Sequence, residues 1–484
     1  MSANRATMPE NRFVYRFTRD LRLDDHAGLR EAAARGAVVP LLVVDDPLGK
    51  RLESSPRRAA FFCAAVAALD AELRERGSRL IVRRGEITAV VTSVVRETSA
   101  AGVAWSADYG ASAQACDTRV QAALEEAGFE VAIVHEAPAI PPEESAAAHT
   151  GAGAGYRAFA PYFEVWRELP VVSYEDPLLL RFASDGVKSE ALPEPVEFGA
   201  QPFHARAGAA AARDAFERFL RDDAARYAQA LLAPADDATS RMSAHLSFGT
   251  ISSRSMVAAV RERARDGLRP VEERASLRLF LRALARRDFF LQLAWFHPAS
   301  ETEPLQEKMR GFALATTHAA LDAWRFGATG FPIVDAGMRQ LRETGWMHPH
   351  VRSIAASFLC FDLGVDWRVG WREWDDYLVE DDPALAVGNW QWIAGVGADM
   401  AQYPRIFNPE RGRRRVDPDG RYVRRWIPEL ERIPIAYWND RALRSSQLAF
   451  DLAIPGGYPR PVVDHERAAR NFLARYRAFT ATIS

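Results

Sequence analysis

The sequence predicts an α/β domain followed by an all-α domain, and three observations support this fold class. Between residues 12 and 135, short apolar runs alternate with helical segments. After Ala211, long helical patterns dominate and strand signals disappear. The stretch between them is rich in Pro, Gly and Ala and shows little periodicity. Because 484 residues exceed what one core can hold, we expect domains at 12–135 and 211–484, joined by a connector at 136–210.

The first domain is predicted to be a parallel sheet with helices on both faces, because strands spaced by helical segments of this length form βαβ units. No GxGxxG or GxxxxGK[ST] motif is present, but the architecture alone leaves open a ligand at the carboxyl ends of the strands. The expected strands are Arg12–Phe17, Ala37–Val44, Arg79–Arg83, Val103–Ser106 and Phe129–His135, and the expected helices are Arg57–Arg76, Ile87–Thr98 and Ala111–Ala127.

The connector and the second domain differ in their patterns. In the connector, residues 155–166 (GYRAFAPYFEVW) carry enough aromatic rings to pack against another element. Further on, Ser276–Phe296 and Asp335–Leu341 show helical periodicity, with Pro or Gly between helices. We therefore expect a helical domain around one large core that can hold a cavity.

Composition excludes several classes of protein. Apolar residues make up 48% and charged residues 26%, which is ordinary for a globular chain. Three widely separated cysteines cannot form a disulfide framework or ligate an iron–sulfur cluster, and the histidines show no metal-binding spacing, so we expect no metal. Neither a membrane span nor a signal-peptide core is evident. We expect a cytoplasmic protein without a membrane partner, and a monomer.

The charge pattern leaves nucleic acid open as a partner. The net charge of −2 argues neither way, but only three of the 62 basic residues are Lys. Arginine favours planar, bidentate contacts with phosphate, although a GC-rich genome would produce the same bias. Basic runs at 411–415 (RGRRR) and 421–425 could meet DNA phosphates or form solvated loops.

Several segments carry candidate chemistry. Residues 239–254 (TSRMSAHLSFGTISSR) offer hydroxyl groups and an arginine at a helix start, which suits a phosphate, although a plain helix cap would look the same. Ten of the twelve tryptophans lie at or after Trp295, where they could simply fill a core. The segments of interest are 330–346 (GFPIVDAGMRQLRETGW), 362–374 (DLGVDWRVGWREW), 388–392 (GNWQW) and 405–409 (RIFNP).

Taken in order, these segments resemble the cryptochrome/DNA photolyase family, as does RDLRL at residues 19–23. The resemblance covers the chain from about Arg12 to Phe479. It implies a Rossmann-like antenna domain, a long connector and a C-terminal helical domain that buries FAD in a U-shaped conformation. In that family, reduced flavin excited by blue light donates an electron to a DNA lesion, whereas cryptochromes use flavin photoreduction as a signal.

The resemblance also implies a set of FAD-binding residues. Glu380 replaces an Asp that pairs with Arg352 beside the isoalloxazine, and we expect the ion pair to persist, because either charge alone would be costly to bury. Ala386 stands where photolyases have an Asn facing flavin N5. The full set is Tyr227, Thr239, Ser240, Arg241, Met242, Ser243, Arg287, Trp346, Arg352, Asp362, Glu380, Asp382 and Ala386, with Tyr227 and Thr239–Ser243 expected at the phosphates.

An electron relay to the flavin is implied as well, but it is incomplete. Trp390 and Trp367 match its first two members, whereas Leu314 stands at the third position, where relatives have Trp. Another ring would have to serve there, and the candidates are Trp324, Trp371 and Trp374.

The lesion-binding residues depart from the family pattern. Ala283 and Arg286 replace the Glu and Trp that bind and stack a flipped pyrimidine dimer, and Pro349 replaces an Asn. A flipped base that loses its stacking partner loses about 1–3 kcal/mol. Trp392 and Arg405 match DNA-contacting residues, and Arg286 could stack its guanidinium plane on a base, so DNA binding is still expected.

Three functions remain open from the sequence. The first is a blue-light-responsive FAD flavoprotein, derived from a photolyase, with a degraded dimer-repair pocket. The second is a working deoxyribodipyrimidine photolyase in which Arg286 and His350 contact the lesion, with His350 protonating near neutral pH. The third is a light-independent, flavin-retaining DNA-binding protein. A second chromophore in the N-terminal domain is also open. The Glu that holds folate in some relatives aligns near Ala113 of this chain, which disfavours folate as that chromophore.

Overall fold

The computed structural model describes residues 11–147, 154–174, 180–200, 206–399, 404–438 and 457–482. The described residues contain a five-stranded parallel sheet in the order β3-β2-β1-β4-β5. The strands are β1 (Arg12–Phe17), β2 (Ala37–Val44), β3 (Ile81–Arg84), β4 (Gly102–Ser106) and β5 (Glu130–Val134). The predicted parallel sheet is therefore confirmed; β1 and β2 have the expected bounds, and ends of β3, β4 and β5 differ by one or two residues.

Helices cover both faces of the sheet. Neighbouring residues of the central strand β1 point to opposite faces, so each face presents apolar side chains to the helices on that side. Tyr15 on β1 belongs to the apolar cluster that contains Phe62 of α3, whereas its neighbour Val14 packs with Val94 of α4 and Leu124 of α5. The helices of this domain are α1 (Ala27–Ala33), α2 (Asp46–Glu53), α3 (Pro56–Glu75), α4 (Ile87–Glu97) and α5 (Ala111–Glu126).

The connector is more ordered than its composition suggests. It contains the helices α6 (Pro142–Ala147) and α7 (Phe159–Trp166), and Phe182 forms a parallel bridge to Val38 of β2. The aromatic stretch packs as expected, since Phe159 and Tyr162 lie 5.6 and 5.3 Å from the ring of Phe289 on α12. The connector thus contacts both domains.

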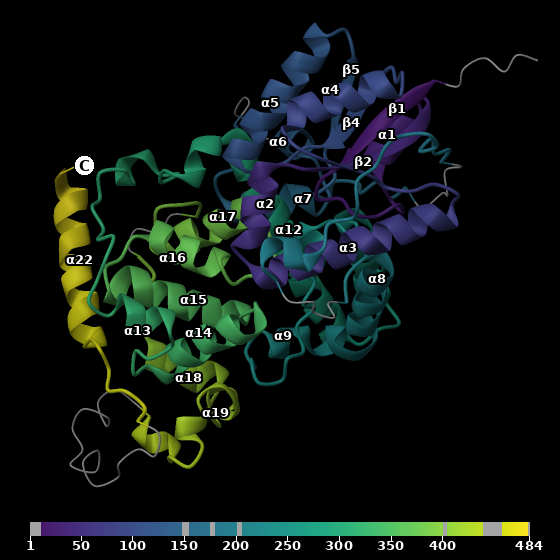
Figure 1. Cartoon of the computed structure of the whole chain (residues 1–484). Helices are drawn as coiled ribbons and strands as arrows, with labels where there is room; N and C mark the ends of the chain where they lie inside the picture. The colour runs from purple at the N-terminus through teal and green to yellow at the C-terminus, as the bar shows by residue number, and fades with distance from the viewer. Residues whose placement is uncertain are drawn as a thin grey trace, which may run out of the picture.

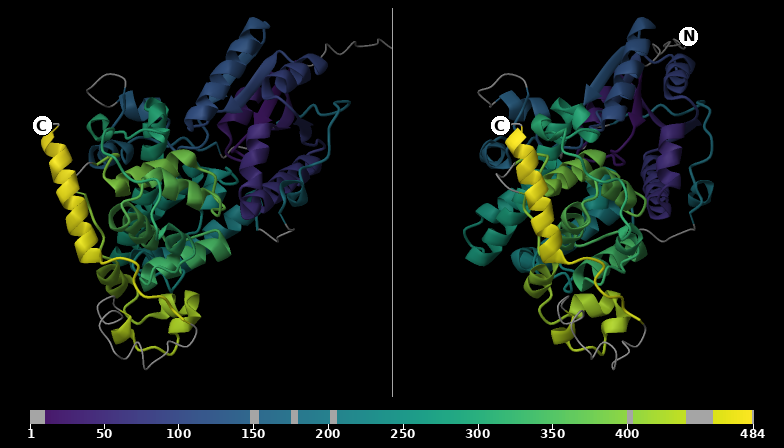
Figure 2. Two further views of the ribbon diagram at one scale, coloured as in Figure 1. Left: turned by 60° about the vertical axis from the view of Figure 1, so that its left-hand side comes forward. Right: turned by 90° about the vertical axis from the view of Figure 1, so that its left-hand side faces the viewer.

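In the described part of the chain, no strand follows residue 206, and the second domain is helical as predicted. Its long central helix α12 contacts α7, α11 and α17, and α22 lies along the outer flank of the helical domain, away from the sheet (Figures 1 and 2). The helices are α8 (Ala209–Arg218), α9 (Tyr227–Ala230), α10 (Ser243–Ser247), α11 (Ser253–Arg265), α12 (Val271–Phe296), α13 (Leu321–Arg325), α14 (Pro332–Thr344), α15 (Pro349–Ser357), α16 (Trp367–Asp375), α17 (Pro383–Ala394), α18 (Pro409–Val416), α19 (Arg421–Trp426) and α22 (His465–Thr482).

Among the described residues, no helix combines the length and the apolar character needed to cross a membrane.

Candidate flavin and DNA sites

Residues from three segments meet at the start of α10, and two of them form an ion pair. Arg352 on α15 places Nη1 2.6 Å from Oε1 of Glu380, which precedes α17. Ser243, the first residue of α10, donates from Oγ to the second oxygen of Glu380 at 3.4 Å. The ion pair expected from the sequence is therefore present, despite the extra methylene of Glu. Both side chains keep some exposure, 25% for Arg352 and 11% for Glu380, so a ligand can still reach them.

Arg241, expected at the phosphates, has partners that the sequence did not predict. Its guanidinium carbon lies 4.0 Å from the centre of the Trp346 ring, and Nε donates to Oδ1 of Asp237 at 2.6 Å. The backbone of Arg241 has φ of 51°, a conformation unfavourable for a side chain with Cβ. Nearby in sequence, the buried Oγ1 of Thr239 has no hydrogen-bond partner among the described residues. A polar ligand group would satisfy that atom.

A second ion pair joins Arg287 of α12 to Asp382 at 3.6 Å. Asp382 caps α17 by accepting from the backbone N–H of Leu385 at 3.1 Å, and Arg287 donates to the carbonyl of Ala137 at 2.6 Å. Burial raises the pKa of Asp382, and the nearby arginine charge opposes that shift. In this arrangement the two residues link α12 and α17 to the start of the connector at Ala137.

The remaining residues that were predicted to bind flavin lie in different surroundings. Tyr227 and Met242 share one apolar cluster, and burial raises the pKa of Tyr227 to about 12, so its hydroxyl stays protonated at neutral pH. Ser240 and Ala386 are half-buried. Asp362 instead contacts the C-terminal helix, 2.6 Å from Nδ1 of His465 on α22, and lines a cavity beside that helix.

Buried tryptophans form two chains. Trp390 on α17 lies 4.5 Å from the ring of Trp374, which stacks on Trp324 at 6.1 Å. Trp367, at the start of α16, stacks on Trp371 at 6.5 Å with 26° between the ring planes. Trp390 and Trp367 are both buried, whereas Trp371 is half-buried and therefore closer to solvent.

Helix α12 turns Arg286 toward aromatic rings. Its guanidinium carbon lies 4.3 Å from the centre of the Phe159 ring and 5.9 Å from that of Trp392. Arg405 lies over the same tryptophan at 5.0 Å. The three residues predicted to contact DNA are therefore neighbours.

The other altered lesion residues lie at the surface. Ala283, one turn before Arg286, is exposed, as is Pro349 at the first position of α15. Burial and the charge of Arg415 lower the pKa of His350 below its ordinary value. The lowered pKa favours the neutral form of His350.

Ion pairs fill the carboxyl ends of the sheet, where the architecture left a ligand open. Arg19 pairs with Asp108 at 3.0 Å and with Asp381 at 3.5 Å, and Arg51 pairs with Asp381 as well. A cavity of about 20 Å³ remains beside them. As the side chains stand, this volume holds about one water molecule.

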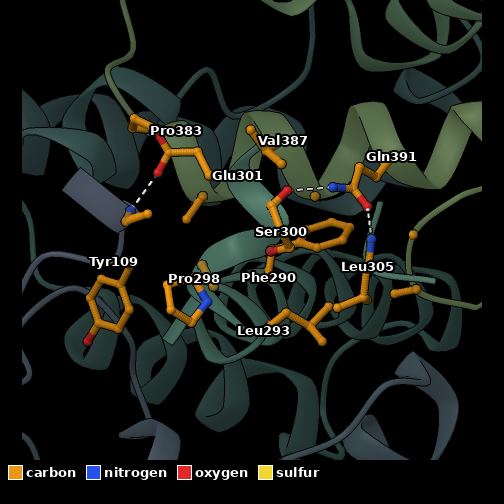
Figure 3. Close-up of a pocket in the computed structure, with 16 residues that line it drawn as sticks. Tyr109, Phe290, Leu293, Pro298, Ser300, Glu301, Leu305, Pro383, Val387 and Gln391 are labelled. Atoms are coloured by element: carbon orange, nitrogen blue, oxygen red, sulfur yellow. Dashed lines mark hydrogen bonds between the residues drawn. The ribbon is translucent and has the colours of Figure 1, made fainter. Parts of the chain in front are cut away.

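A pocket lies between the start of α5 and the helical domain, where Tyr109, Phe290 and Val387 line it (Figure 3). Glu301 accepts from the backbone N–H of Ala111 at 2.5 Å, at the start of the helix that carries Ala113. Gln391 ties the opposite wall by donating to the carbonyl of Ser300 at 2.5 Å. A cavity of about 20 Å³ remains between these residues.

A larger cavity of about 690 Å³ lies between α1, α8 and α11. Phe216 and Tyr174 line it, and the guanidinium of Arg30 lies 4.9 Å over the Tyr174 ring. The cavity therefore combines aromatic surface with a cation.

A parallel α/β domain followed by a helical domain with these ion pairs and tryptophans defines a two-domain protein of photolyase architecture. Residues 13–178 match the family model described as DNA photolyase, and residues 280–478 match the model described as FAD binding domain of DNA photolyase. The chain belongs to the DNA photolyase/cryptochrome family.

Relatives in this family cover nearly the whole chain. A deoxyribodipyrimidine photo-lyase of Streptomyces griseus is 38% identical, covering 95% of this chain and 98% of the relative. One of Halobacterium salinarum is 35% identical, covering 95% and 97%. Cryptochrome-1 of Arabidopsis thaliana is 31% identical, covering 93% of this chain and 68% of the relative.

Solved structures agree with this assignment. A bacterial class III photolyase from Agrobacterium tumefaciens has a TM-score of 0.84 at 28% identity, covering 99% of this chain and 100% of that chain. An archaeal photolyase from Sulfolobus tokodaii with two FAD molecules has a TM-score of 0.81 at 28% identity, covering 96% and 100%.

Proposed function

We propose that this protein is a blue-light-responsive FAD flavoprotein that binds DNA but repairs pyrimidine dimers poorly. One observation carries the proposal: the family's FAD-binding domain and the ion pair between Arg352 and Glu380 persist, while Ala283, Arg286 and Pro349 replace lesion-recognising groups. A dimer without its stacking ring and hydrogen-bond partners loses several kcal/mol of binding, at about 1–3 kcal/mol for each lost contact.

The residues present fit a flavin dinucleotide. Ser243, Arg352 and Glu380 would hold the flavin end, and Arg241 with Thr239 would hold the phosphates, where the unsatisfied Oγ1 supports a polar ligand. When bound, FAD supplies absorption of blue light and one-electron chemistry. Arg241 can contact phosphate while keeping Asp237, because a guanidinium has five N–H donors.

We assign the electron relay to Trp390, Trp367 and Trp371, with Trp371 in place of the missing third tryptophan, because α16, which carries Trp367 and Trp371, packs against the Trp390 ring at Gly370. Its half-buried ring stacks on Trp367, so it is suited to exchange electrons with a donor in solution. Replacing any of the three by Phe should slow photoreduction of the bound flavin by an external thiol. Trp438, which is buried in the same domain outside both tryptophan chains, provides the control, since Trp438→Phe should leave the rate unchanged.

The deciding experiment is an absorption spectrum of purified holoprotein before and after blue light, with and without dimer-containing DNA. Photoreduction without dimer repair is the expected result. Repair at the rate of a working photolyase would overturn the proposal in favour of a rebuilt repair pocket. A bound flavin that does not photoreduce would instead favour a light-independent DNA-binding protein.

We place the second chromophore, if the protein carries one, in the cavity of about 690 Å³ beside Tyr174 and Phe216. The two alternative positions retain only about 20 Å³ each, and the aromatic walls with Arg30 suit a planar molecule that bears an anionic group. A chromophore released from denatured protein, and lost in Tyr174→Ala, would support this position. Retention in that variant would contradict it.

A further inference from the structure

Three arginines lie over aromatic rings where α7, α12 and α17 meet. The guanidinium of Arg282 lies 4.9 Å from the ring centres of both Phe159 and Phe163, next to that of Arg286 over Phe159. Arg405 completes the group over Trp392. We call this set the arginine–aromatic layer; it comprises Arg282, Arg286, Arg405, Phe159, Phe163 and Trp392.

The positive charges of this layer are not neutralised. Within the described residues, none of the three arginines has a carboxylate within ion-pair distance, although Arg residues elsewhere in the chain are commonly paired. The nearest acidic influence on Arg286 is Asp399, whose Oδ1 accepts from the backbone N–H of Phe159 at 2.7 Å. Burial, together with the charges of Arg282 and Arg405, lowers the pKa of Arg286. An external anion would relieve this repulsion.

The layer can stack a base but cannot read its edge. The planar guanidinium of an arginine that contacts aromatic rings is also able to stack on a nucleobase. Between Arg282 and Arg286 the exposed helix position is Ala283, which has no polar atom to hydrogen-bond a base. Bases are available for such stacking in an unpaired strand, whereas an intact duplex offers chiefly phosphates.

We propose that the arginine–aromatic layer binds an unpaired DNA strand, stacking bases on its guanidinium planes and holding the adjacent phosphates, without distinguishing damaged from undamaged bases. This inference rests on the proposed function, which supplies DNA as the partner, and it adds the form of DNA and the residues that select it. Stacking of this kind tolerates any sequence, because every base has a π face.

The test measures fluorescence anisotropy of short labelled oligonucleotides with the holoprotein over a range of salt concentrations. A thymine strand should bind more tightly than both the matching duplex and an abasic strand with the same phosphates. Arg286→Gln should weaken binding of the thymine strand by about 5- to 150-fold if one base stack of about 1–3 kcal/mol is lost. Arg96→Gln, an exposed arginine on α4, is the matched control and should bind as the unmodified protein does.

Arg286→Lys separates stacking from charge. Lysine keeps the phosphate contact, so the slope of log affinity against log salt should stay unchanged, but the affinity should not recover. Arg282→Gln should reduce that slope by about 0.7 if its phosphate contact is lost. Comparison of the thymine and abasic strands needs no substitution, so the proposal remains testable even if a variant misfolds.

Three results would overturn the proposal: equal binding of duplex and single strand, equal binding of the abasic strand, or tighter binding of a dimer-containing strand than of an undamaged one. Photoreduction of the flavin in the same samples reports separately on the proposed function. A protein that photoreduces normally but ignores single strands would refute this inference alone.

Discussion

Replacing Gly370 by alanine should destabilise the protein and disturb the environment of Trp390. A Cβ at this position of α16 would lie 2.3 Å from Cη2 of Trp390 and 2.4 Å from Cδ2 of Leu359. Both distances are shorter than any real contact, so the tryptophan ring or the helix must move. Overpacking of a core costs about 1–3 kcal/mol. This cost opposes the gain of about 0.5–1 kcal/mol that alanine normally brings over glycine within a helix.

The matched control is Gly49→Ala on α2, where a Cβ meets no atom within 4 Å. That variant should show only the helical gain, so the two free energies of unfolding should differ by about 1–3 kcal/mol. Urea unfolding followed by tryptophan fluorescence measures the difference, and flavin photoreduction should slow in Gly370→Ala alone. Equal stability of the two variants, with equal photoreduction, would refute the packing of α16 against Trp390 described above.

Three further predictions concern the flavin site, pH and the lesion face. Glu380→Gln should lower flavin occupancy, measured as the ratio of flavin to protein absorbance, whereas Glu380→Asp should retain it; equal loss in both would contradict a role for the ion pair. Burial lowers the pKa of His245 and of His348 to about 4, below the ordinary value of 6.5, so unfolding takes up protons between these values. Their contribution to stability is therefore complete above about pH 6.5 and is lost as the pH falls toward 4. His245→Asn should make the fall in unfolding free energy with pH, measured by urea unfolding, shallower by about 1.4 kcal/mol per pH unit. An unchanged fall would count against burial of the neutral ring. Arg286→Trp combined with Ala283→Glu should tighten binding of dimer-containing DNA by about 5- to 150-fold in anisotropy titrations, and no gain would show that other residues block the pocket.

The sheet domain was predictable because its signals are local. Apolar runs such as Ala37–Val44, buried along its whole length, mark a strand without reference to the rest of the chain. The short helices α1 and α2 were not predicted, since seven or eight residues give too little periodicity. The connector was predicted as irregular, yet Phe182 pairs with β2, because a backbone bridge leaves no pattern in side-chain composition.

The candidate site was predictable only where it follows motifs. The pairing of Arg352 with Glu380 followed from the resemblance, but the partners of other charges did not. Asp237 accepts a hydrogen bond from Arg241, four residues away in the loop before α10, a local contact that the sequence analysis did not propose. His465 contacts Asp362 across 103 residues, and this contact depends on where α22 packs, which no sequence pattern indicates.

The positions of Arg286 and Ala283 explain how residues at these sites can vary without disturbing the fold. The guanidinium of Arg286 lies over Phe159 and Trp392, so this arginine takes part in the ring contacts between α7, α12 and α17. Ala283 is exposed, so its side chain contributes little to the core. Substitutions that break the ion pair of Arg352 and Glu380 would cost more stability, because they leave an uncompensated, partly buried charge. The surface that carries Arg286 and Ala283 can therefore vary at little cost in stability, whereas a substitution in the pair of Arg352 and Glu380 must keep both charges.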